Sequence, residues 1–170
     1  MSTAKMELIV EMLEQAHQAT LKVAQALPES ARLYQPAPGR ATPLWLVGHL
    51  ANSNDKIGNG WMLGQEPLIP LATARIFAPD FAGGKPPTTD ATMYPPFDEV
   101  VALYDQVMTR MIGGVRAMTD EQLPQPLKAE VPERLRAHFG SNHSTLTMLI
   151  GHDAYHRGQV ALLGKLGAGQ

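Results

Sequence analysis

Apolar residues recur every three or four positions in four segments of the chain, which is the spacing of helices that bury one face. Pro28 ends the first segment. Thr42 and Pro43 give the second an N-cap and a first-turn proline, and Gly64 stops it. No segment keeps the strict alternation of a strand, so the pattern predicts an all-α four-helix bundle. The expected helices span residues 6–27, 43–63, 97–118 and about 141–167.

The connection between the second and third helices, residues 64–96, is rich in Pro, Gly and Thr and has no lasting periodicity. It is longer than joining two helices requires, and such loops are often functional. We therefore expect it to form part of a pocket mouth. The alternative is a passive linker or a contact within a homodimer. Residues 119–123 (TDEQL) predict a short capped turn, and residues 1–170 are expected to form a single domain.

The fourth helix carries two histidines, His152 and His156, one turn apart on the same face. Such a pair can chelate one metal ion, because neutral imidazole is a common ligand for zinc and its neighbours. At about 100° per residue the pair shares a sector with several apolar residues, which predicts that both point into the core. Asp153 and Arg157 predict an ion pair at the surface. The sector of the histidines holds Met148, Leu149, Tyr155, Gln159, Leu163 and Leu166.

Two histidines make a weak site, and no His, Asp, Glu or Cys follows His156, so a third ligand has to lie upstream. His143 would be about 13 Å along the same helix from the first of the pair, and His138 falls in a loop. His49 is the best candidate, because it lies in the middle of the second helix on an apolar face. His17 also lies on an apolar face, where a hydrogen-bonded core imidazole is the favoured interpretation.

Composition excludes several classes of function. With 14 Lys and Arg against 16 Asp and Glu, the formal net charge is −2, which gives no basic footprint for nucleic acid or an anionic membrane. No apolar run is long enough to span a bilayer, and charges interrupt any signal peptide. Because the chain has no cysteine, a metal site must use His, Asp or Glu. We expect a cytoplasmic protein that acts on a small molecule.

Four motifs resemble those of the DinB-like superfamily, which is named for DNA-damage-inducible proteins and overlaps the bacillithiol- and mycothiol-dependent transferases. They are PLWLVGHLA at 43–51, TDEQL at 119–123, HDAYHRGQ at 152–159 and LLGKLG at 162–167. The resemblance implies an antiparallel bundle with long crossover connections and a metal held by His49, His152 and His156. Many members have no known reaction, so the fold cannot name a substrate.

Three neutral imidazoles in a tetrahedral site leave one position open, as in catalytic zinc sites. That position can take water, a small-molecule thiol as thiolate, or a substrate oxygen. Zinc is the leading ion, although nickel, manganese and iron also suit three nitrogens. These features favour a metal-dependent thiol transferase or hydrolase, without identifying a catalytic base. The alternative is a non-catalytic, stress-linked bundle with a structural metal. Candidate pocket-lining residues are His17, Asn52, Ser53, Tyr155 and Gln159.

Overall fold

All regular structure in the described part of the chain is helical. The computed structural model describes residues 4–169, apart from the side chain of Arg134, and within that range it contains no strand. The four expected helices are present close to their predicted ends, which confirms the all-α class. They are α1 (Ala4–Gln25), α2 (Pro43–Ser53) with its π-helical continuation (Asn54–Met62), α4 (Phe97–Arg116) and α5 (Asn142–Ala168).

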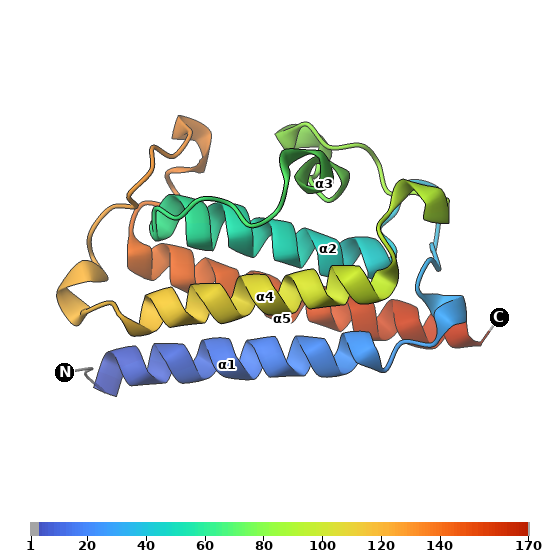
Figure 1. Ribbon diagram of the computed structural model, residues 1–170, viewed down its shortest axis with the longest axis horizontal. Coiled ribbons are helices and arrows are strands. Elements are labelled where there is room, and N and C mark those ends of the chain that lie inside the picture. The colour runs from blue at the N-terminus through green and yellow to red at the C-terminus, as the bar shows by residue number, and fades with distance from the viewer. Residues whose placement is uncertain (1–3, 170) are drawn as a thin grey trace.

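The long helices form a bundle in which each packs against two others (Figure 1). α1 and α5 run in one direction, whereas α2 and α4 run in the opposite direction. Both α1 and α2 contact α4 and α5, so α1 and α2 occupy opposite corners of the bundle. The α1–α2 and α4–α5 connections therefore cross the two ends of the bundle diagonally. This arrangement agrees with the crossover connections that the family resemblance implies.

Two predictions around α4 are confirmed. Tyr104, Met108 and Met111 are at most 1% exposed, so the apolar stripe of this helix faces the core. After α4, a single helical turn at Asp120–Gln122 has reciprocal capping between Thr119 and the third residue of the turn. The turn then gives way to the loops that lead to α5.

The second helix begins where the sequence predicts, because the Thr42 hydroxyl accepts a hydrogen bond from the Trp45 N–H at 3.1 Å. After eleven residues it widens into the π-helical stretch. There the Leu63 N–H donates to the Gly58 carbonyl, five residues back, at 3.0 Å. Gly64, with a φ of 67°, ends the helix in a conformation that favours glycine.

The connection at residues 64–96 contains a short helix, α3 (Leu71–Ile76), that the sequence pattern does not predict. Six residues between prolines and glycines carry too little periodicity to reveal a helix. Figure 1 shows α3 and its neighbours lying over α2. Phe77 anchors the connection: its ring is 0% exposed and packs against Gly48, where an added Cβ would overlap the ring. The connection therefore folds onto the bundle.

The buried face of α5 differs from the predicted one. Leu149 and Leu163 are buried as expected, but Tyr155 is 64% exposed and Leu166 is 47% exposed. His152 and His156 are half-buried at the edge of the stripe that faces the core. The reason is that α5 packs against both α1 and α2, which centres its buried stripe between those helices and leaves the histidines on the side of α2.

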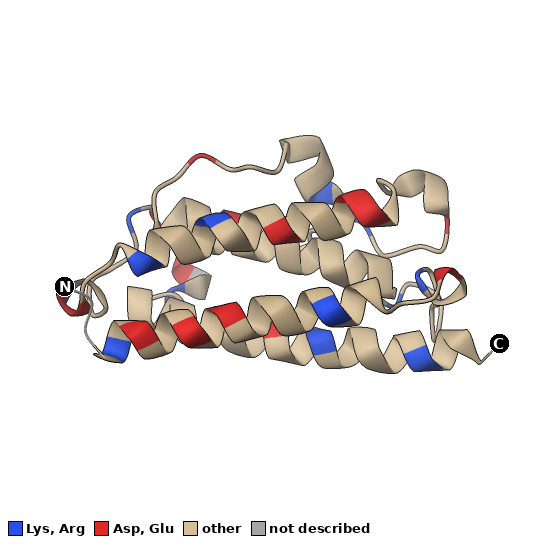
Figure 2. Cartoon of the chain, turned by 60° about the horizontal axis from the view of Figure 1, so that its bottom comes forward, with Lys and Arg blue, Asp and Glu red and all other residues tan. Residues whose placement is uncertain are grey.

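Acidic and basic residues are interspersed along the helices (Figure 2). The clearest run of one sign is on the first half of α1, where Glu7, Glu11 and Glu14 follow one another. Glu14 forms an ion pair with Arg116 of α4. Among the described residues, none of the helices combines the length and apolar character needed to cross a membrane.

Candidate metal centre

Three histidines from two helices meet between α2 and α5. His49 comes from the middle of α2, and His152 and His156 come from successive turns of α5. The Nε2 atom of His152 lies 3.2 Å from Nε2 of His49 and 3.0 Å from Nε2 of His156. Ligand atoms of all three lie within 4.8 Å of one another, so the group could hold a metal ion. The structure thus brings together the three histidines that the sequence singled out.

The spacing of the ring nitrogens suits a small divalent ion. Zn–N bonds of about 2.05 Å at tetrahedral angles separate two nitrogens by about 3.3 Å. The observed separations of 3.2 and 3.0 Å differ from that value by only a few tenths of an ångström. The His152 ring is not fully hydrogen-bonded, because its buried Nδ1 has no partner among the described residues. A neutral imidazole also has only one N–H, so hydrogen bonds between Nε2 atoms cannot satisfy all three rings. A cation shared by the three Nε2 atoms fits this donor set better than hydrogen bonds alone.

Two neighbours orient the imidazoles. Nδ1 of His49 lies 3.0 Å from the Phe77 carbonyl oxygen, and Nδ1 of His156 lies 2.6 Å from Oε1 of Gln159. An Nδ1–H that donates to these oxygens leaves the lone pair on Nε2, the atom that faces the cluster. The Trp45 ring also stacks on His49, with centroids 4.8 Å apart and planes 7° apart. Sequence reasoning missed the Phe77 carbonyl, because a backbone oxygen leaves no mark in the sequence.

The environment keeps the imidazoles neutral. Burial lowers the pKa of His49 to about 4, although the hydrogen bond to Phe77 opposes this effect. Burial, together with the charges of His156 and His49, lowers the pKa of His152 to about 3. Burial also lowers the pKa of His156. Neutral imidazole is the form that binds metal, so the site has ligand character at neutral pH.

The other three histidines lie elsewhere. His17 is 5% exposed, and its Nε2 atom lies 2.8 Å from a carboxylate oxygen of Asp105. It is therefore a hydrogen-bonded core imidazole outside the group of three. His138 and His143 are exposed. Among the described residues, no further His, Asp or Glu places a ligand atom within the group.

The remaining pocket candidates are divided between two places. Gln159 contacts His156, and its amide nitrogen donates to the Tyr155 hydroxyl at 3.2 Å, so both residues flank the histidines. Asn52 lines a cleft that the three histidines themselves do not line. Ser53 is 9% exposed and buried within α2.

The prediction that Asp153 and Arg157 pair at the surface is wrong, because Asp153 is buried. The two side chains do meet, at 3.3 Å, but Asp153 is only 1% exposed. Its carboxylate accepts hydrogen bonds from the Thr20 hydroxyl at 2.7 Å and the Tyr104 hydroxyl at 2.6 Å. Burial raises the pKa of Asp153, and these hydrogen bonds oppose that shift. The network ties α5 to α1 and α4, one residue away from His152.

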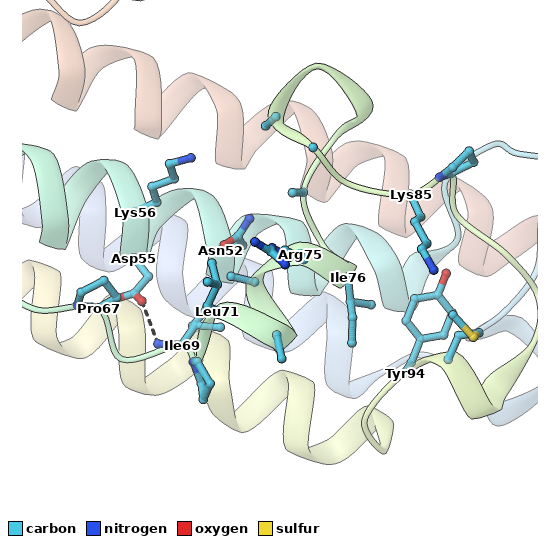
Figure 3. Close-up of a pocket in the computed structure, with 18 of the residues that line it drawn as sticks. Asn52, Asp55, Lys56, Pro67, Ile69, Leu71, Arg75, Ile76, Lys85 and Tyr94 are labelled. Atoms are coloured by element: carbon cyan, nitrogen blue, oxygen red, sulfur yellow. Dashed lines mark hydrogen bonds between the residues drawn. The ribbon is translucent and has the colours of Figure 1, made fainter. Parts of the chain in front are cut away.

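The connection at residues 64–96 contacts the histidine centre and also forms a wall of a cleft (Figure 3). The Trp45 indole N–H donates to the Ile76 carbonyl at 3.0 Å, next to the Phe77 carbonyl that faces His49. The cleft has a volume of about 1060 Å³. The three histidines do not line it, but Asn52 does, one helical turn beyond His49. The cleft therefore begins close to the candidate metal centre.

The fold and the site together define a class of protein, an all-α bundle with three histidines that could hold a metal ion. Comparison with known families assigns the class: the model of the DinB superfamily matches residues 12–160. The chain belongs to the DinB superfamily. Comparison with curated proteins gave no match.

Proposed function

We propose that this protein is a divalent-metal-dependent enzyme, either a thiol-dependent transferase or a hydrolase, whose metal ligands are His49, His152 and His156. The observation that carries the proposal is the close approach of the His152 Nε2 atom to Nε2 of His49, at 3.2 Å, and to Nε2 of His156, at 3.0 Å. The other two rings are also oriented through Nδ1. When bound, a divalent ion with an open coordination position lowers the pKa of water or of a thiol.

The protein residues supply binding, orientation and partial exclusion of water. Phe77 and Gln159 hold two of the imidazoles in the tautomer that presents Nε2. The stacked Trp45 ring shields His49, which is 8% exposed. His152 and His156 are half-buried, so the centre is reachable by a small molecule. This combination of fixed ligands and partial access supports a catalytic role.

A structural metal is the second candidate, because an ion here would link α2 to α5. A closed structural site normally has four protein ligands. The residue best suited to close it, His17, is instead paired with Asp105. The group of three histidines therefore supports an open site, and we favour the enzyme.

Between the two chemistries, we favour the thiol-dependent one on family resemblance. The chain has no cysteine, so a thiol nucleophile would come from a small molecule. Zinc as the bound ion, a homodimer and a cytoplasmic location stay predictions from the sequence.

The test offers metal-loaded protein a panel of activated esters and amides, and then alkylating electrophiles with and without small thiols. Turnover that requires a thiol would identify a transferase, and turnover without one would identify a hydrolase. The His49→Ala protein should be inactive in either assay, whereas His143→Ala should match the wild type. If no substrate is turned over while His49→Ala strongly lowers the melting temperature, the metal site is structural and the protein is not the proposed enzyme.

A further inference from the structure

We propose that the cleft between α2 and the 64–96 connection binds a small organic anion with an apolar body. That the cleft is the substrate pocket of the enzyme rests on the function proposed above. That the cleft binds an anion rests only on the residues that line it. A volume of about 1060 Å³ is at the upper end of the range typical of small-molecule sites.

The charges that line the cleft are unbalanced. Lys56 comes from the π-helical part of the second helix, Arg75 from α3 and Lys85 from the loop that follows it. All three are exposed, and none forms an ion pair with a carboxylate of the described residues. Figure 3 shows them spread along the cleft, with Lys85 at the end that holds Tyr94. The Lys56 ammonium lies 5.6 Å from the centre of the Trp61 ring, a contact that leaves its charge in place.

The one carboxylate in the lining has its own partners. Asp55 is 2% exposed, and one of its oxygens accepts from the Ile69 N–H at 2.9 Å. The other oxygen accepts from the Asn59 amide at 3.1 Å. Asp55 therefore anchors the connection to the floor of the cleft, and it does not pair with the three cations. A chain with a formal net charge of −2 thus presents a cationic cleft, which attracts anions.

The rest of the lining is mainly apolar, which selects an organic anion over an inorganic one. Leu71 is 68% exposed and Met93 is 43% exposed, so both leave apolar surface open to water. The Tyr94 ring also lines the cleft, and its hydroxyl is held by the Thr88 backbone at 2.9 and 3.1 Å. An apolar body against these side chains would remove that surface from water, and a carboxylate, sulfonate or phosphate would pair with the cations. Arg75 is suited to two parallel hydrogen bonds with such a group.

The cleft is connected to the histidine centre through Phe77. The Tyr94 ring stacks on the Phe77 ring, with centroids 6.0 Å apart and planes 18° apart. The Phe77 carbonyl in turn accepts from His49. Asn52 lines the cleft one helical turn from the same histidine. A molecule held in the cleft therefore lies beside the candidate metal centre.

The test uses 8-anilinonaphthalene-1-sulfonate, an aromatic anion whose fluorescence rises on binding, and Nile red as an uncharged probe. We expect saturable binding of the anion to the wild type. The Lys56→Gln/Arg75→Gln/Lys85→Gln protein should bind it about tenfold more weakly, because three cation contacts of modest strength are lost. Nile red binding should change less than twofold. Circular dichroism shows whether each variant is folded.

A matched control removes three positive charges elsewhere, at Lys5, Lys22 and Lys165, which are exposed on α1 and α5. This control should bind the anion as the wild type does. Equal weakening in both triple variants would overturn the proposal, because net charge alone would then explain the binding. An unchanged affinity in the cleft variant would overturn it as well.

The same titrations on metal-free and metal-loaded protein separate this proposal from the enzyme. Anion binding that survives in the metal-free protein and in His49→Ala supports the cleft even if no turnover is found. In an active enzyme, the cleft triple variant should raise KM for anionic electrophiles with little change in kcat or metal content. An unchanged KM would overturn the role of the cleft as the substrate pocket.

Discussion

Replacing Asp153 tests the buried network that fixes α5 against α1 and α4. In Asp153→Ala, the hydroxyls of Tyr104 and Thr20 would lose their acceptor, and each residue is at most 1% exposed. A buried hydroxyl left without a partner costs about 1–3 kcal/mol. Removing a buried carboxylate recovers part of that loss, because burial raises the pKa of Asp153 and so disfavours its charged form. We expect a net destabilisation of about 3 kcal/mol.

The matched variant is Asp153→Asn, which keeps the size of the side chain and one acceptor oxygen, and replaces the other oxygen with an NH2 group that donates. Burial and the neighbouring carboxylate raise the pKa of Tyr104 well above its usual value, so its hydroxyl remains a donor. Asn can accept from one hydroxyl and donate to the other, so we expect a loss of only about 1 kcal/mol. The measurement is urea unfolding of metal-free protein at pH 7, followed by circular dichroism. Equal losses in both variants, or a loss below about 1 kcal/mol in Asp153→Ala, would refute the argument.

Three further predictions follow from the histidine centre and its surroundings. Gln159→Leu removes the acceptor for Nδ1 of His156, so zinc affinity measured by chelator competition should fall about tenfold or more; unchanged affinity would contradict this orienting role. The pKa of His49, about 4 in the fold against 6.5 unfolded, means that the unfolded chain binds more protons below pH 6.5. Metal-free protein should therefore lose up to about 3 kcal/mol of unfolding free energy as the pH falls from 6.5 to 4. His49→Gln should show a shallower loss, and equal pH profiles would count against the assignment. Gly48→Ala would push the Phe77 ring away from α2, so its melting temperature should fall by several degrees; an unchanged melting temperature would show that the connection is not anchored there.

The helices could be predicted because their signals are local. Thr42 and Pro43 mark the start of α2, Gly64 marks the end of its π-helical continuation, and a regular apolar stripe marks α4. Each feature acts within one or two helical turns, where spacing along the chain determines which side chains meet. The histidine pair of α5 was visible for the same reason.

The predictions of burial on α5 failed because burial there depends on packing between segments that are distant in the sequence. Asp153 and Arg157 have the spacing of a surface pair, but α5 contacts two helices and turns Asp153 toward Tyr104. Tyr155 was expected in the core and is exposed for the same reason. The pattern of a single helix predicts one buried face, and it cannot show how wide that face becomes when two neighbours share it.

Parts of the site could not be read from the sequence at all. The group that orients His49 is the backbone carbonyl of Phe77, and any residue at that position would carry the same atom. The cations of the cleft, Lys56, Arg75 and Lys85, are spread over thirty positions and carry no motif. They converge only because the 64–96 connection folds back over α2.

The proposed metal centre is tested most directly by the metal content of protein that has been purified without a nickel column, measured by elemental analysis. We expect about one divalent ion per chain in the wild type, and severe loss in His49→Ala, because two imidazoles hold a borderline metal poorly. The exposed His143 provides the control, and His143→Ala should keep the wild-type content. Full metal content in His49→Ala would contradict the central claim that this histidine completes the site.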